Sequence, residues 1–228
     1  MKTHVFTTLV AGIILSACGG SSTPAPTPTA PSPQPAAAST TFQGIVAGSG
    51  GQSGTLTLTI QAVIASSSVR PLAVSQGSGT LHLVGASTVA LTGTYDSVTS
   101  AVSFAGGGFT FAGTVSGGAL AGTYGGPNGS RGGFSSLNGT GATVTVYCGT
   151  LKDPTTGSLD PFNIAVSASG AISGVVSDNR DVISLRGQLA GTAATLTGSD
   201  GGSFGPVIIQ NGSVTGPGIT GSTTACSG

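Results

Sequence analysis

Short runs of alternating apolar and polar residues dominate the chain after Phe42. In TLTLTI, residues 55–60, the two leucines and the isoleucine share one face of an extended chain, and threonines occupy the other. This two-residue period is typical of a β-strand with one buried face. The pattern recurs in FTFAGTV, TVTVYC, FNIAV and ISLRGQL, which begin at residues 109, 143, 162 and 183. Since no window has a helical period, the chain is predicted to be all-β.

Turn-forming sequences separate these runs at short intervals. The Asn-Gly dipeptides at 128–129, 138–139 and 211–212 favour the type I′ turn of a β-hairpin. The segments AGGGF, SGGAL and SDGGSF supply further glycine-rich turns. Many short strands joined by tight turns predict an antiparallel meander.

Glycines recur on the apolar face of the predicted strands. Gly93 lies between Leu91 and Tyr95, and Gly113 follows Phe111 by two residues. A glycine on the inner face lets a sheet bend sharply and leaves space for a large neighbour. We therefore expect the meander to curl into one or two small β-barrels or sandwiches, after a disordered Pro-rich linker.

A change in composition near Tyr147 suggests two β-units. Most aromatic residues precede this point, and the segment YCGT opens a half rich in Gly and Thr. We expect a first unit over residues 42–147 and a second over 148–228. One larger barrel would also fit the length.

The first twenty residues have the layout of an export signal. Lys2 and His4 precede the apolar stretch VFTTLVAGIILSA, which ends in small residues and is too short to span a bilayer as a helix. The sequence LSAC, which ends at Cys18, resembles the lipobox of bacterial lipoproteins. This resemblance implies a signal peptide over residues 1–17 and cleavage before Cys18. It also implies a diacylglycerol on the Cys18 thiol and an acyl chain, such as palmitate, on the freed amine.

The same resemblance implies a lipid-anchored location in the bacterial cell envelope. Each buried methylene adds about 0.8 kcal/mol of membrane affinity, and two or more chains give stable anchoring. Gly19, where an Asp is associated in that family with the inner membrane, favours the outer membrane. Residues 18–41 form a Pro-, Ala- and Thr-rich linker that could reach roughly 60 Å when extended. The Gly- and Thr-rich second half also resembles β-meander segments of uncharacterised bacterial secreted lipoproteins.

Three cysteines occur in the chain. If lipid occupies Cys18, then Cys148 and Cys226 are the intramolecular pair, and an export compartment favours their oxidation. The disulfide would join the first strand of the second half to its last strand. Because Cys148 shares a strand face with Val144 and Val146, we expect its sulfur to point inward.

The composition offers little for catalysis or nucleic-acid binding. The formal net charge is zero and 5% of residues are charged, whereas nucleic-acid surfaces need clustered Lys and Arg. After signal removal His82, on the polar face of TLHLVG, is the one histidine, and there is no glutamate. The six aspartates adjoin turn residues and are expected to bond their own backbone. We expect no enzyme activity and no cofactor.

One polar cluster is a candidate metal site. The segment SDNRD, residues 177–181, offers Asp178, Asn179 and Asp181 as oxygen ligands for calcium. It lacks the spaced ligands and final Glu of an EF-hand loop. We therefore expect no metal there.

The segment ALTGTYDS, residues 90–97, resembles a strand of the avidin and streptavidin family, an eight-stranded barrel that binds biotin. The resemblance implies a ligand-contacting position for Tyr95. That family's pocket is walled by several tryptophans, and this chain has none. We therefore expect a structural role for Tyr95.

Two functions remain. The first is a membrane-anchored envelope lipoprotein with a structural or surface-interaction role, whose partners are the membrane and an unknown protein. The alternative is a lipocalin-like binding module, in which the curled sheet encloses a small apolar ligand. A large internal cavity would favour the alternative, and a filled interior with apolar loop tips would favour the first.

Overall fold

The computed structural model describes residues 38–61, 74–178 and 181–227. Strands make up most of these residues, with three 3-10 turns: η1 (Ser49–Gly51), η2 (Pro127–Gly129) and η3 (Thr224–Cys226). Within these ranges, no helix is long and apolar enough to cross a membrane. The predicted signal peptide, Cys18 and the linker up to residue 37 lie outside the described residues.

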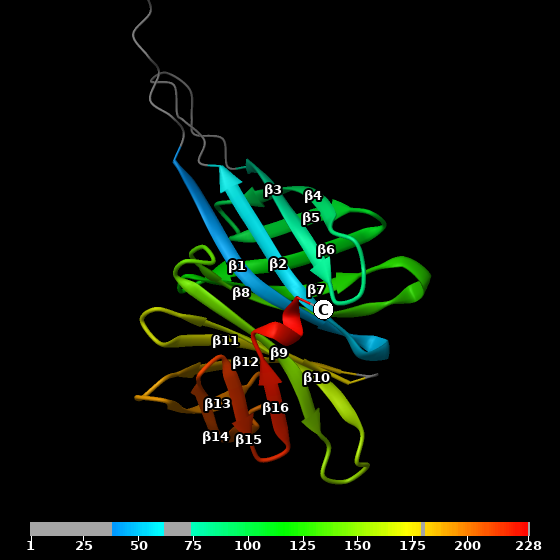
Figure 1. The fold of residues 1–228 in the computed structure, drawn as a ribbon. Coiled ribbons are helices and arrows are strands. Elements are labelled where there is room, and N and C mark those ends of the chain that lie inside the picture. The colour runs from blue at the N-terminus through cyan, green and yellow to red at the C-terminus, as the bar shows by residue number, and fades with distance from the viewer. Residues whose placement is uncertain (1–37, 62–73, 179–180, 228) are drawn as a thin grey trace, which may run out of the picture. The chain divides into compact units, whose positions relative to one another are not determined.

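The first eight strands form a closed antiparallel barrel. Each strand pairs with the next, and β8 closes the barrel on β1 (Figure 1). The strands are β1 (Ser39–Gly48), β2 (Gln52–Gln61), β3 (Val74–Leu83), β4 (Val89–Asp96), β5 (Ala101–Gly106), β6 (Phe109–Ser116), β7 (Ala119–Gly125) and β8 (Arg131–Asn138).

The next eight strands form a second closed barrel of the same topology, in which β16 pairs with β9. These strands are β9 (Val144–Lys152), β10 (Leu159–Ser167), β11 (Ala171–Ser177), β12 (Val182–Gln188), β13 (Ala193–Gly198), β14 (Ser203–Gln210), β15 (Ser213–Gly216) and β16 (Ile219–Ser222). The prediction of an all-β antiparallel meander that forms barrels is confirmed.

The strand boundaries refine the expected division of the chain. Residues 139–143 connect the barrels, so a boundary between residues 147 and 148 falls inside β9. The predicted linker extends to residue 41, but residues 39–41 pair with β2 and belong to the first barrel. Thr41, for example, pairs with Thr59, and their hydroxyls are hydrogen-bonded at 3.2 Å.

The three Asn-Gly dipeptides occupy three different kinds of position in the fold. Asn211 and Gly212, with φ of 53° and 74°, form the expected two-residue turn between β14 and β15. Asn128 and Gly129 also have positive φ, but they lie in a longer connection that contains η2. The hairpin expected at 138–139 is wrong. Asn138 ends β8, whose partners are β1 and β7, and the chain then passes to the other barrel.

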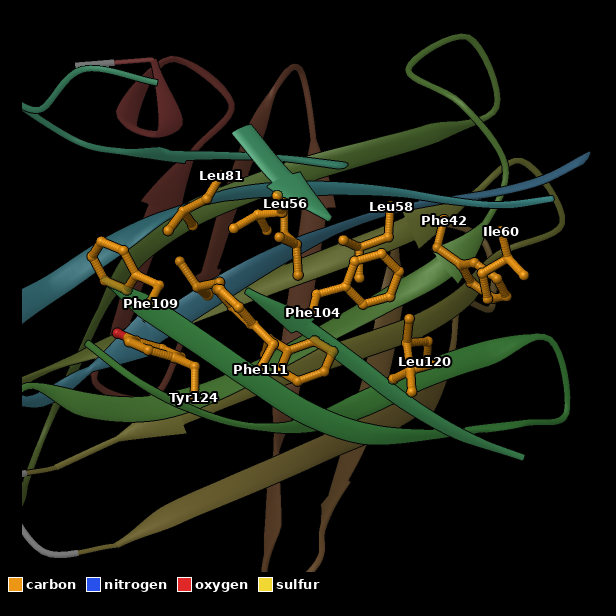
Figure 2. Packing of buried hydrophobic residues seen from close by; sticks show 14 residues of the cluster. Phe42, Leu56, Leu58, Ile60, Leu81, Phe104, Phe109, Phe111, Leu120 and Tyr124 are labelled. Atoms are coloured by element: carbon orange, nitrogen blue, oxygen red, sulfur yellow. The ribbon is translucent and has the colours of Figure 1, made fainter. Parts of the chain in front are cut away.

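Apolar side chains fill the first barrel, as Figure 2 shows. The three apolar residues of TLTLTI point inward from β2, as their spacing predicted. Phe111 stacks on Tyr124 with ring centroids 5.4 Å apart and meets Phe134 edge-on at 5.5 Å. The apolar residues that alternate with polar ones in the sequence therefore form the filled core of this barrel.

Inward-facing glycines make room for large side chains in both barrels. An added Cβ at Gly77 would lie 2.6 Å from Cζ of Phe104, and one at Gly93 would lie 2.6 Å from its Cγ. In the second barrel, an added Cβ at Gly174 would lie 2.7 Å from Ile164. These distances are too short for real contacts, so the glycines are required where the side chains pack.

Replacing Gly77 with Ala should destabilise the first barrel by about 1–3 kcal/mol, because the new methyl group overlaps the Phe104 ring in a filled core. Urea unfolding measures the loss. Gly141→Ala is the matched control, since its added carbon meets nothing within 4 Å. Adding Phe104→Leu to Gly77→Ala should recover part of the loss. Equal stability of the two single variants would contradict this packing.

Several strands are buried on both faces, which the two-residue pattern did not predict. In β10, Phe162 and Ile164 point into the second barrel, while Asn163 and Ala165 point out of it. All four are 0% exposed, because the outer face of β10 packs against the first barrel. FNIAV is therefore a fully buried strand and not a half-buried one.

A buried polar cluster joins the barrels. The Asn163 amide donates to the backbone carbonyl of Val46 and to Ser53 Oγ, and its Oδ1 accepts the Gly149 N–H at 3.1 Å. Buried Ser135 and Ser173 hydrogen-bond to each other across the same interface. Leaving such groups unpaired costs about 1–3 kcal/mol each, so the cluster favours one alignment of the two barrels.

Cys148 and Cys226 form a disulfide with Cα atoms 5.0 Å apart, as predicted. The predicted inward direction is wrong. Tyr147 and Leu151 face the core of the second barrel, so Cys148 faces outward, and its sulfur lies 3.9 Å from the Gly54 carbonyl oxygen of the first barrel. Because both faces of β9 are covered, alternation alone did not reveal which face lines the barrel.

Replacing both cysteines with Ala should lower the free energy of unfolding by about 4.5 kcal/mol, from the entropy of closing a loop of 78 residues in the unfolded chain. Urea unfolding of the double variant checks this value. Wild-type protein unfolded under reductant is the second comparison and should lose a similar amount. Unchanged stability in both would contradict a stabilising role for the bridge.

Candidate functional site

The candidate residues for chemistry in the first barrel are His82 and Tyr95. His82 lies half-buried on the outer face of β3, opposite Thr55, and its imidazole forms no hydrogen bond within the described part of the chain. Tyr95 packs against the core of the first barrel, which supports the structural role expected for it.

Four of the six aspartates stabilise turns, as expected. Asp96, Asp153, Asp178 and Asp200 each accept a hydrogen bond from a backbone N–H two or three residues later. The donors to Asp153, Thr156 foremost and then Thr155, hold the pKa of its carboxyl below the usual value. Asp153 is therefore ionised at neutral pH.

The SDNRD segment is only partly described, because Asn179 and Arg180 lie outside the described residues. Asp178 and Asp181 are held together by the Asp181 N–H, which donates to the Asp178 carboxylate. Within the described ranges, no group of three or more His, Cys, Asp or Glu side chains is arranged to hold a metal ion.

The second barrel brings four aspartates to one mouth, which we call the acidic mouth. Asp160 lies in β10, two residues before the inward-facing Phe162. Three others lie directly beyond neighbouring strands, also two residues from an inward-facing apolar side chain. The four are Asp153 beyond β9, Asp160, Asp178 beyond β11, and Asp181 before β12; the apolar layer beneath them is Leu151, Phe162, Val176 and Ile183.

Two adjoining cavities open at this mouth. The larger, about 770 Å³, is lined by Leu151, Phe204 and Ile219 together with the β9–β10 turn. The smaller, about 320 Å³, is lined by all four aspartates and shares Leu151 and Phe204 with the larger one. The apolar lining of the larger cavity thus adjoins the carboxylates that line the smaller one.

The carboxylates of the acidic mouth act on one another. Burial raises the pKa of the Asp160 carboxyl, and the charges of Asp178 and Asp153 raise it further. The second of these increases arises from repulsion between the Asp160 carboxylate and the two neighbouring carboxylates. The sequence could have placed Asp160 inward by counting back from Phe162, but it could not show which neighbouring strands bring the other aspartates there.

Two further clefts lie where the barrels meet. One, about 500 Å³, is lined by residues of η1, the β3–β4 turn, Cys148 and Leu159. The other, about 430 Å³, is lined by Tyr124, Arg131 and Asp181 among others. The Tyr124 hydroxyl donates to Gln52 Oε1 at 2.9 Å, and burial raises its pKa to about 12.

Comparisons of the chain with protein families, with curated proteins and with solved structures find no match.

Tyr124 should make stability fall at high pH. Its pKa is near 10 in the unfolded chain and about 12 in the fold, so its contribution is complete below pH 10 and is lost as the pH rises through 12. The difference corresponds to about 2–3 kcal/mol. Urea unfolding across this range should show a shallower loss in Tyr124→Phe than in the wild type. Parallel profiles would contradict the burial of a neutral phenol.

Proposed function

We propose that this protein is a lipid-anchored component of the bacterial cell envelope, at the outer membrane, whose double barrel serves surface interactions and not catalysis. One structural observation carries the proposal. Cys148 and Cys226 are bonded to each other, which leaves Cys18 as the remaining cysteine of the chain. Cys18 ends the lipobox-like sequence LSAC, where lipidation would occupy its thiol.

The start of the fold supports the same proposal. The first strand begins at Ser39, directly after the Pro-rich segment. A chain of this composition acts as an extended, semi-rigid spacer. A spacer between a lipidated cysteine and a folded domain would hold the barrels away from the bilayer, where they can meet a partner.

The filled barrels favour surface interactions over an enclosed ligand. Phe104 and Phe111 occupy the first barrel, and Leu185 and Leu196 are fully buried in the second. Apolar side chains are instead exposed near turns, with Val98 79% exposed. A lipocalin-like module needs an open centre, so this alternative has less support.

Metabolic labelling with radioactive palmitate tests the anchor. The wild-type chain should carry label and co-fractionate with outer membranes, whereas Cys18→Ser should carry none, because it removes the thiol that the lipid would modify. Ser21→Ala, in the adjoining linker, is the control and should label like the wild type. Equal labelling of Cys18→Ser and wild type would refute the anchor.

A further inference from the structure

The cleft of about 500 Å³ where the barrels meet, which we call the junction cleft, is built from both of them. The first barrel contributes η1 and the β3–β4 turn, and the second contributes residues of β9 and β10. Ala225 of η3 completes the described lining, and η3 contacts both β2 and β9 (Figure 1). A cleft of this volume falls within the range of small-molecule sites, which often occur where two domains meet.

Two large apolar side chains are exposed at the junction cleft, one from each barrel. Val84 of the β3–β4 turn is 41% exposed, and Leu159 of β10 is 64% exposed. The backbone of each is held in place, because the Val84 N–H donates to the Ser53 carbonyl oxygen at 2.9 Å and Leu159 pairs with Lys152 of β9. Exposed apolar side chains that line a cleft are typical of a binding site, since a ligand that covers them removes apolar surface from water.

Charged side chains are absent from the described lining of the junction cleft. It consists of glycines, apolar residues, the disulfide-bonded Cys148 and three uncharged polar residues, Gln52, Ser53 and Thr150. By contrast, charged side chains line the other cleft between the barrels and both cavities of the acidic mouth. An ion that left water for the junction cleft would meet no described side chain of opposite charge, which is costly. The junction cleft therefore favours an uncharged ligand.

Gln52 supplies the junction cleft with a hydrogen-bond donor. Its Oε1 accepts a hydrogen bond from the hydroxyl of Tyr124, a residue of the first barrel's core. Its amide N–H groups have no acceptor among the described residues. A side-chain amide can donate two hydrogen bonds. An acceptor oxygen on a ligand would satisfy one of them.

We infer that the junction cleft binds a small, uncharged, mainly apolar molecule that carries a carbonyl or similar acceptor oxygen. The apolar part would cover Val84 and Leu159, and the oxygen would accept a hydrogen bond from Gln52. This site lies outside the barrels, so it is compatible with their filled centres. The inference goes beyond the proposed envelope role and does not depend on the lipid anchor.

Four probes with similar stems test the inference. Phenylbutanone carries a carbonyl, butylbenzene carries no polar group, and phenylbutylamine and phenylbutyrate are a cation and an anion at neutral pH. They are titrated into the ¹⁵N-labelled full chain carrying Cys18→Ser, which keeps lipid and detergent out of the sample. The ketone should bind about fivefold more tightly than the hydrocarbon, from one added hydrogen bond, and about tenfold or more tightly than either ion. The shifted amides should be those of η1, the β3–β4 turn and the start of β10.

Val84→Ser should weaken ketone binding about fivefold, because it removes apolar surface from the cleft. Val98→Ser makes the same change in the β4–β5 turn, outside the cleft lining, and should bind like the wild type. Both side chains are exposed, so neither change should affect folding. Gln52→Leu should abolish the preference for the ketone over butylbenzene, whereas a merely structural effect would weaken both probes equally.

Any of five results would overturn the inference: no ketone binding, equal binding of the ketone and the ions, shifted amides elsewhere, equal affinities in Val84→Ser and Val98→Ser, or a ketone preference that persists in Gln52→Leu. Because Cys18 is absent from every sample, these outcomes are independent of whether the wild-type chain is lipidated.

Discussion

The packing of Phe104 on two glycines shows the constraint on which the fold depends. An eight-stranded barrel has an interior just wide enough for side chains to fill, so each large residue needs a small one opposite. Phe104 of β5 pairs with Gly93 of β4, which pairs with Gly77 of β3, and the ring lies where two Cβ atoms would have been. Repeated in both halves, this arrangement closes the sheets with few aromatic residues and no tryptophan.

The outer faces of the two filled barrels pack against each other. Outward-facing Ile45, Ala47 and Val175 form one apolar contact between the barrels, and the Asn163 cluster lies beside it. An apolar contact alone tolerates sliding, whereas buried hydrogen-bonding groups each need a particular partner. The disulfide borders the same interface, so the strand that begins the second barrel is held by its core, by the first barrel and by η3.

Sequence patterns correctly predicted the features that depend on residues close together along the chain. The period of TLTLTI placed its leucines inward, and the glycine-rich turns joined the expected strands. What failed depended on contacts between distant strands. Cys148 and Val146 looked like lumen residues because they alternate with polar positions, but the first barrel covers that face. Asn138-Gly139 is a favourable hairpin-turn sequence, but no hairpin forms there, because β8 already pairs with β1 and β7. Each aspartate adjoins its own turn in the sequence, and only the strand order shows that four of them converge.

Because the barrel centres are filled, cavities of the described chain lie at a mouth of the second barrel and where the barrels meet. A filled centre leaves no room for a ligand, whereas the junction of the barrels retains clefts of about 500 and 430 Å³. The ends of the strands are open as well, because side chains there do not need to interlock across the centre. At the acidic mouth, the register of β10 places Asp160 on the same strand face as the inward-facing Phe162. Burial raises the pKa of its carboxyl, and the charges of Asp178 and Asp153 raise it further. Among the described residues, carboxylate side chains thus gather at the strand ends, and charged side chains are absent from the filled centre of the second barrel, where burying a charge would be costly.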